Sequence, residues 1–261
     1  MSERGRRFAL VTGATSGIGL AIARTLATGG DKVRICARNA DNVALTVKQF
    51  KEDGLDVDGT TCDVRSRESV AEFVGSAVER HGPVDILVNN AGRSGGGITA
   101  EIGDDLWFDV IDTNLNGVFL MTRAVLTTGG MLEKSWGRVI NIASTAGKQG
   151  VVFGAPYSAS KHGVVGFTKA LGNELGKSGI TVNAVCPGYV ETPMAQAIRK
   201  RHADFYETTE DAILDRFTAK IPLGRYSTPE EVAGLVGYLA SDTAASITAQ
   251  AINVCGGLGN F

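Results

Sequence analysis

Residues 8–19 read FALVTGATSGIG, a short apolar run followed at once by glycines at positions 13, 17 and 19. The apolar run is typical of a buried β-strand, and the amphipathic stretch from Gly17 to Thr28 has helical length. Glycines at such a turn let backbone N–H groups approach an anion, and the helix N-terminus favours phosphate. The spacing GxxxGxG differs from the common GxGxxG, yet its place between strand and helix predicts a dinucleotide-binding loop.

The alternation of apolar runs with helical stretches continues along the chain. A second clear helical stretch is residues 66–80. Strands that are apolar throughout and separated by helices indicate a parallel sheet covered on both faces. We therefore predict a single domain over residues 1–261: an α/β, Rossmann-like, doubly wound sheet of about seven strands. The expected strands are FALVT from Phe8, VRIC from Val33, DILVNN from Asp85, RVINIAS from Arg138 and ITVNAVCPG from Ile180, with weaker candidates at residues 57–62 and AINV from Ala251.

One polar segment, residues 191–226, interrupts this alternation between ITVNAVCPG and a helix expected near Pro229. An insertion after the carboxyl end of a strand lies where open α/β sheets bind ligands. We interpret it as a helical lid over a substrate cleft. A solvated surface excursion is the alternative.

Composition limits the kind of protein. The 261 residues carry a net charge of −2, which gives no general attraction to nucleic acid or to membranes. No run of 18 apolar residues predicts a membrane span, and the charged start MSERGRRF does not resemble a secretory signal. The four cysteines form no CxxC pair, which favours reduced thiols in a cytoplasmic protein. His81 and His202 lack partners at metal-ligand spacing, so we predict no metal site.

The residues after the second, third and fourth expected strands predict how the dinucleotide is held. An NAD-selective site places a carboxylate after the second strand to bind the ribose 2′-hydroxyl, whereas this chain has Arg38. A guanidinium suits a 2′-phosphate, so the sequence favours NADPH over NADH. Asp63 and Val64 follow the third strand as an adenine contact. Residues 89–92, NNAG, follow the fourth, where small residues let the backbone lie against the cofactor.

Tyr157 and Lys161 lie four residues apart in YSASK, behind Pro156, which suits the first turn of a helix. This spacing places both side chains on one helical face. A free phenol, with a pKa of about 10, is a poor acid–base catalyst at neutral pH. We expect the lysine cation to stabilise the phenolate and to lower the pKa of Tyr157. Ser144, at the end of RVINIAS, is placed to hold a substrate carbonyl oxygen.

These motifs resemble the short-chain dehydrogenase/reductase family. TGATSGIG, NNAG, Asn114, Ser144, YSASK and the PG of residues 187–188 occur in the family's order over nearly the whole chain. The resemblance implies a tetrad: Tyr157 protonates the carbonyl oxygen, Ser144 orients it, Lys161 binds the nicotinamide ribose and tunes Tyr157, and Asn114 supports a proton-relaying water. It also implies that Thr192 contacts the nicotinamide amide. The expected cofactor-binding residues are Thr12, Gly13, Thr15, Ser16, Gly17, Ile18, Gly19, Arg38, Asp63, Val64, Asn90, Ala91, Gly92, Tyr157, Lys161, Pro187, Gly188, Val190 and Thr192.

Longer stretches resemble the ketoreductases of aromatic (type II) polyketide pathways, the actinorhodin type among them. They are NNAGRSGGG from Asn89, NIASTAGKQGVV from Asn141, APYSASKHGVVGFTKALGNEL from Ala155, ITVNAVCPGYVETPMA from Ile180 and the terminal NVCGGLGNF. The resemblance implies reduction of one ketone, C9, of a poly-β-ketone bound to an acyl carrier protein. Relatives often carry Pro-Gly-Gly, linked with stereochemical control, where this chain has Ser94-Gly95-Gly96, so the handedness of the alcohol stays open. The expected substrate contacts are Ser94, Gly95, Gly96, Gln149, Val151, Met194 and Tyr206, with Phe153 beside them.

Two arginines suggest where a carrier protein binds. Arg65 and Arg93 each follow the carboxyl end of an expected strand, where they could meet the phosphopantetheine phosphate or an acidic carrier protein. The resemblance also implies a homotetramer. Two other functions stay open: a 3-oxoacyl-carrier-protein reductase of fatty acid synthesis, which would share every catalytic residue, and a dinucleotide-binding sensor without catalysis, which the intact tetrad disfavours.

Overall fold

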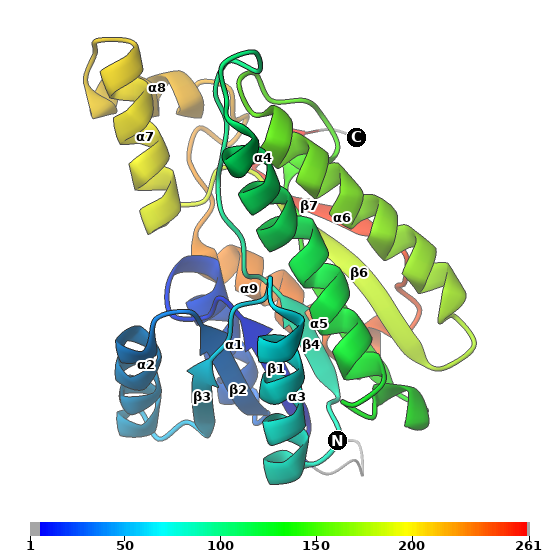
Figure 1. Ribbon diagram of the computed structural model, residues 1–261. Coiled ribbons are helices and arrows are strands. Elements are labelled where there is room, and N and C mark those ends of the chain that lie inside the picture. Colours follow the sequence, from blue (N-terminus) through cyan, green and yellow to red (C-terminus); the bar gives the residue numbers. More distant parts are fainter. Residues whose placement is uncertain (1–5, 260–261) are drawn as a thin grey trace.

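In the computed structural model, which describes residues 6–259, seven parallel strands form one sheet with helices on both faces (Figure 1). The strand order is β3-β2-β1-β4-β5-β6-β7, so the predicted doubly wound α/β fold is confirmed. Residues 1–5 of the charged start and residues 260–261 of the NVCGGLGNF segment lie outside the described residues. The strands are β1 (Phe8–Thr12), β2 (Lys32–Ala37), β3 (Val57–Thr61), β4 (Ile86–Asn89), β5 (Gly137–Ile142), β6 (Ile180–Pro187) and β7 (Ala251–Val254).

Apolar helix faces cover the two sides of the sheet. Ile22, Phe50 and Val232 belong to the buried cluster on one side, which α1, α2 and α9 form. Phe73 and Met121 belong to the cluster on the other side, with α3, α5 and α6. Burial of these faces drives the layering. The helices are α1 (Gly17–Thr28), α2 (Ala40–Glu52), α3 (Arg67–His81), α4 (Asp104–Ile111), α5 (Gly117–Leu126), α6 (Ala155–Glu174), α7 (Pro193–Phe205), α8 (Glu210–Thr218) and α9 (Pro229–Leu239), with a π-helical turn η1 (Asp112–Asn116) and 3₁₀ turns η2 (Met131–Glu133), η3 (Thr145–Gly147) and η4 (Asp242–Ala244).

Several strands end earlier than the sequence suggests. β3 ends at Thr61, β4 at Asn89 and β5 at Ile142, where the ladders with their neighbours stop, whereas β2 runs one residue beyond the expected VRIC, to Ala37. Arg38 and Ser144 therefore stand on the connections and not within strands, free of the sheet's hydrogen-bond pattern. The two weak candidate strands are real and lie at the two edges of the sheet. Their partly exposed side chains explain the weak apolar signal.

The strand order reverses between β1 and β4. β1 pairs with β2 on one side and with β4 on the other, so the connections after these strands diverge at their carboxyl ends. Open α/β sheets bind ligands at such a switch point. The polar segment 191–226 contains α7 and α8, which project beyond the sheet at this edge (yellow in Figure 1). Within residues 6–259, no helix is both long and apolar enough to cross a bilayer.

Candidate active site

The loop after β1 requires glycine at specific positions. Gly13 and Gly17 have φ of +63° and +53°, a conformation that glycine adopts without steric cost. A Cβ on Gly13 would lie 2.8 Å from the Cα of Ala91, and a Cβ on Gly19 would overlap the side-chain nitrogen of Asn90. The missing side chains let the loop, α1 and the residues after β4 meet closely.

Polar contacts lock this loop to the connection after β4. The Asn90 side chain donates to the carbonyl oxygens of Thr12 and Gly13, both at 2.9 Å. The Thr12 hydroxyl accepts from the backbone N–H groups of Asn90 and Ala91, at 3.0 and 2.9 Å. At the start of α1, the Ser16 side chain makes no capping hydrogen bond and the first turn holds no acidic residue. Its N–H groups are therefore available to an anion, and the cradle fits the pyrophosphate of a dinucleotide.

Arg38 has no ion-pair partner among residues 6–259, whereas Asp63 is already paired with an arginine. Arg38 is exposed beyond β2, and no carboxylate among residues 6–259 forms an ion pair with it. Its guanidinium is therefore free for a 2′-phosphate. Asp63 is bound by Arg65, whose hydrogen bonds lower the pKa of this carboxyl. The adenine contact predicted for Asp63 and Val64 remains a prediction.

Three of the four candidate catalytic side chains gather between α6 and the end of β5. Lys161 is buried, with its Nζ donating to the carbonyl of Ile142 at 2.8 Å. The same nitrogen lies 5.8 Å from the ring centroid of Tyr157. The Ser144 hydroxyl lies close enough to Tyr157 to lower the pKa of the phenol, and the Ser144 oxygen accepts from the N–H of Ala146 at 3.1 Å. The structure therefore places Ser144 next to Tyr157 of the YSASK motif.

Asn114, the fourth residue, lies in the π-helical turn η1 and is completely buried. Its side-chain oxygen accepts from the N–H of Arg93 at 2.8 Å, and its amide donates to the carbonyl of Arg93 at 3.0 Å and to the hydroxyl of Ser160 at 3.1 Å. Single π-turns are frequent at functional sites because they re-aim side chains within a helix. The Asn114 side chain thus ties the connection after β4 to α6. The water relay expected of it stays a prediction.

Burial controls the acid–base properties of this group. Burial raises the pKa of Tyr157, and the hydrogen bond with Ser144 offsets only part of that rise. The expectation that Lys161 lowers the pKa of Tyr157 is therefore wrong for this structure, because desolvation of the phenolate outweighs the other contributions. Burial likewise lowers the pKa of Lys161 to about 8. At neutral pH the phenol keeps its proton, which is the state a proton donor needs.

Two loops expected to contact substrate meet at one point. The N–H of Gly97 donates to the carbonyl of Phe153 at 2.8 Å, and a Cβ on Gly96 would overlap that carbonyl oxygen. Phe153 has a φ of +60°, a strained conformation of the kind that clusters at ligand sites. Gly95 packs against Val110 of α4. The segment 94–97 and the loop before α6 therefore form one joined surface.

The end of α7 reaches this surface. The rings of Phe153 and Phe205 lie 6.0 Å apart between centroids, and those of Phe205 and Tyr206 5.0 Å apart. Phe205 is 62% exposed and was not foreseen; the adjacent aromatic pair in the polar segment was its only signal. Arg201 of α7 donates to the Ser94 hydroxyl at 3.5 Å. The other expected substrate residues are exposed near these loops or on α7: Gln149, Val151, Met194 and Tyr206.

Residues 7–203 match the family model of the short chain dehydrogenases. The chain belongs to this family. It is therefore an oxidoreductase that acts on a ketone or alcohol group.

Relatives of this short-chain dehydrogenase include polyketide ketoreductases. A protein of Streptomyces virginiae named as a ketoacyl reductase of the monensin polyketide synthase is 70% identical, over 100% of both chains. A granaticin counterpart of Streptomyces violaceoruber is 63% identical, covering 97% of this chain and 93% of its own. A solved structure of an actinorhodin polyketide ketoreductase variant with NADPH has a TM-score of 0.96 and 59% identity, with full coverage of both chains. A 3-oxoacyl-[acyl-carrier-protein] reductase of Pseudomonas aeruginosa is 41% identical, over 99% of both.

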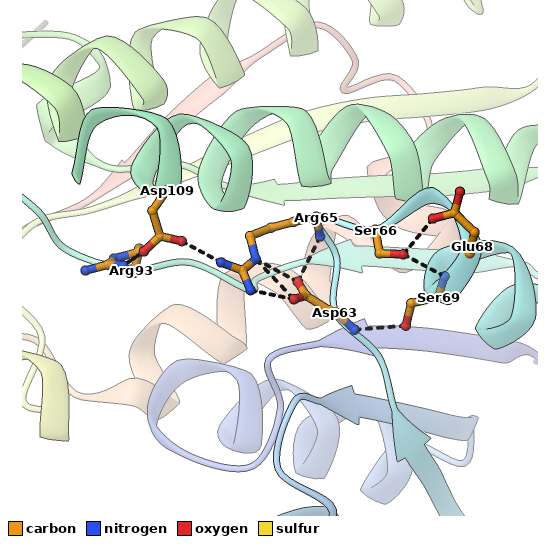
Figure 2. Close-up of polar contacts among 7 residues, drawn as sticks. All are labelled: Asp63, Arg65, Ser66, Glu68, Ser69, Arg93 and Asp109. Atoms are coloured by element: carbon orange, nitrogen blue, oxygen red, sulfur yellow. Dashed lines mark hydrogen bonds and ion pairs between the residues drawn. The ribbon is translucent and has the colours of Figure 1, made fainter. Parts of the chain in front are cut away.

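The two arginines predicted to meet a carrier protein are already paired with carboxylates in this dehydrogenase (Figure 2). Arg65 binds Asp63 and Asp109, and Arg93 binds Asp109 as well. Asp109, on α4, was not foreseen, because no local spacing relates it to either arginine. The two cations are thus neighbours joined through one carboxylate.

Proposed function

We propose that the chain is an NADPH-dependent ketoreductase that reduces one ketone, C9, of a poly-β-ketone bound to an acyl carrier protein in an aromatic polyketide pathway. One observation carries the reaction: Tyr157, Ser144 and Lys161 converge beside a glycine cradle that fits a dinucleotide. The identities of 59–70% to proteins named as polyketide ketoreductases, over the full chain in two cases, support the substrate class. A cytoplasmic homotetramer is part of this proposal.

The proposed cofactor sits in the cradle after β1. The pyrophosphate would lie at the start of α1 and the 2′-phosphate on Arg38. Thr192 would lie next to the nicotinamide, and its methyl group would be 3.2 Å from a Cβ on Gly17, which supports its placement at the cradle. NADPH would supply the hydride.

The proton comes from the chain's own residues. Ser144 is near enough to Tyr157 to influence its pKa, so a carbonyl oxygen placed between them could accept from both hydroxyls. Ser144 would donate a hydrogen bond to the oxygen as negative charge develops. Tyr157, which burial keeps protonated at neutral pH, would transfer its proton to that oxygen.

Lys161 would restore the donor. Its Nζ uses one N–H on the Ile142 carbonyl, which leaves two for a ribose and for proton return. A pKa of about 8 lets it release and regain a proton near neutral pH. Asn114 would hold the connection after β4 at a fixed distance from α6 through its hydrogen bonds to Arg93 and Ser160. Substrate and cofactor would then meet in a fixed geometry.

The lid assignment for residues 191–226 rests on the aromatic contact between Phe205 and Phe153. α7 and α8 share an apolar cluster that includes Ile213 and Phe217, and the ring of Tyr189, just after β6, stacks on Phe217 and joins this cluster to the end of the strand. Met194 near the start of α7 is 41% exposed and Tyr206 after its end is 40% exposed, so both are accessible to a ligand. Such a mixture of rings and polar edges suits a flat polyketone.

A 3-oxoacyl-carrier-protein reductase is the second candidate, favoured by the 41% identical relative of Pseudomonas aeruginosa. Initial rates of NADPH oxidation with trans-1-decalone, a bicyclic ketone, and with a linear 3-oxoacyl thioester distinguish the two. The polyketide proposal expects the larger kcat/KM for decalone and little reaction with NADH. Faster turnover of the linear thioester would assign the fatty acid reaction. Tyr157→Phe is the control for background oxidation, since it lacks only the donor hydroxyl.

A further inference from the structure

Among residues 6–259, Asp109 is the one carboxylate that pairs with both predicted docking arginines. Its Oδ1 accepts from Nη1 of Arg65 at 2.7 Å, and its Oδ2 forms an ion pair with Nη1 of Arg93. Asp109 comes from α4, whereas Arg65 follows β3 and Arg93 follows β4. Figure 2 shows the carboxylate between the two guanidinium groups. Three connections therefore meet in one polar cluster beside the tetrad.

The backbone of Arg93 is fixed while its side chain is not. Both its N–H and its carbonyl are hydrogen-bonded by the catalytic candidate Asn114. The guanidinium, in contrast, is 40% exposed and bonded to Asp109, apart from one bond of 3.3 Å from Nε to the adjacent Ser94 carbonyl. The side chain can therefore change its anionic partner without moving the tetrad.

Arg65 is held in place independently of Asp109. Asp63 accepts from Nε of Arg65 at 3.0 and 3.1 Å, from Nη2 at 2.6 Å and from the backbone N–H at 3.0 Å. Only Nη1 points to Asp109. Loss of the Asp109 contact would leave Arg65 oriented, with one donor edge free for another anion.

Asp109 helps to neutralise the positive charge of the two arginines. The two arginines and the two aspartates of the cluster sum to zero, so the unliganded surface presents no strong positive field to a distant anion. The ion pairs of Asp109 are partly exposed, with its side chain at 24%, and such pairs are weak because water competes for both partners. A phosphate can satisfy both guanidinium groups at once, and the released carboxylate can hydrate.

We propose that Asp109 is a displaceable counter-ion: it holds Arg65 and Arg93 in the unliganded reductase and gives way to the phosphate of a phosphopantetheine arm. This inference rests on the proposed function, because it needs a substrate carried on such an arm. A ketone without a phosphate does not displace Asp109. The exchange therefore adds selectivity for carrier-bound substrate at a site separate from the reacting carbonyl.

The test measures binding of 4′-phosphopantetheine by titration calorimetry, with saturating NADPH so that the Arg38 site is filled. Asp109→Asn keeps the side chain's size and removes its charge. Asp105→Asn is the matched control, since Asp105 is an exposed carboxylate on the same helix that pairs with no cation among residues 6–259. We expect Asp109→Asn to bind about 5- to 10-fold more tightly than the wild type and Asp105→Asn within about twofold, because two weak ion pairs no longer compete.

Two further measurements locate the effect. Pantetheine without the phosphate should show no gain in Asp109→Asn. The gain should also disappear in Asp109→Asn combined with Arg93→Gln, as a double-mutant cycle requires. A gain in affinity cannot come from simple structural damage.

Affinity of Asp109→Asn equal to that of Asp105→Asn, or below wild type, would overturn the proposal, because Asp109 would then orient the arginines instead of competing for them. Failure of the proposed function has a different signature. If the wild type does not reduce a carrier-bound polyketone but Asp109→Asn still gains phosphopantetheine affinity, the counter-ion role stands and only the natural substrate changes.

Discussion

Replacement of Lys161 by methionine should stabilise the unliganded protein while it abolishes reduction. Lys161 is 5% exposed, and burial lowers its pKa from 10.5 to about 8. At about 1.4 kcal/mol per pKa unit, keeping Lys161 protonated in the folded state at pH 7 costs about 3 kcal/mol relative to the unfolded state. Methionine has a similar length and loses the hydrogen bond to the Ile142 carbonyl, worth about 1 kcal/mol. The free energy of unfolding should rise by about 2 kcal/mol.

The pH dependence of unfolding tests the direction of this stability change independently. Because the pKa of Lys161 is lower in the folded than in the unfolded chain, the unfolded chain holds the extra proton between pH 8 and 10.5. The wild type therefore gains stability from this group as pH rises through that window. The advantage of Lys161→Met should fall from about 2 kcal/mol at pH 7 to below about 1 kcal/mol at pH 9.5.

Urea unfolding of the cofactor-free proteins at both pH values measures this difference. Lys169→Met is the matched control, because Lys169 is an exposed lysine of the same helix; it should change stability by no more than about 0.5 kcal/mol. A Lys161→Met protein less stable than wild type at pH 7, or an advantage that does not shrink at pH 9.5, would refute the reasoning.

Four other substitutions have definite expected outcomes. Arg38→Gln should lower kcat/KM for NADPH about 10- to 100-fold and leave NADH rates unchanged, since a charge-assisted hydrogen bond contributes about 1.5–3 kcal/mol; steady-state kinetics with both cofactors check this, and an equal loss for both would contradict the 2′-phosphate assignment. Gly96→Ala should destabilise the protein by at least about 2 kcal/mol, because the added Cβ would overlap the Phe153 carbonyl oxygen. Gly75→Ala should stabilise the protein by about 0.5–1 kcal/mol, because Gly75 lies in α3 with open space around it. Thermal unfolding of the two variants and the wild type measures both changes. Tyr157→Phe should lose ketone reduction but still bind NADPH, measured as quenching of the protein's intrinsic fluorescence in a titration. Turnover near the wild-type rate would mean that another group donates the proton.

Local patterns predicted much of the fold and the reacting group. The glycine loop, the YSASK spacing and the serine after β5 each depend on residues close in the sequence, so their geometry could be anticipated from strand and helix periods. The sequence also indicated both edge strands, although weakly.

Contacts between distant segments could not be anticipated. Asp109 joins Arg65 and Arg93 only because α4 folds over two strand ends, and nothing in the spacing of these residues signals it. The direction of the pKa shift of Tyr157 was missed for a related reason: it depends on how much protein surrounds the phenol. Phe153 and Phe205 meet because α7, which ends at Phe205, folds back over the loop before α6, about 50 residues earlier in the sequence.

The position of β1 inside the sheet, between β2 and β4, affects how the protein folds during synthesis. β1 is synthesised before the other six strands of this sheet, but it pairs with β4 as well as β2, and the Thr12 hydroxyl accepts from the later N–H groups of Asn90 and Ala91. At about 5–20 residues per second, one edge of FALVT stays unpaired on the ribosome for about 4–16 s. An unpaired apolar edge invites aggregation, and no dinucleotide can protect it before residue 91 has emerged. Substitutions that slow docking of β4 should therefore reduce the yield of protein in cells more than the activity of the molecules that fold.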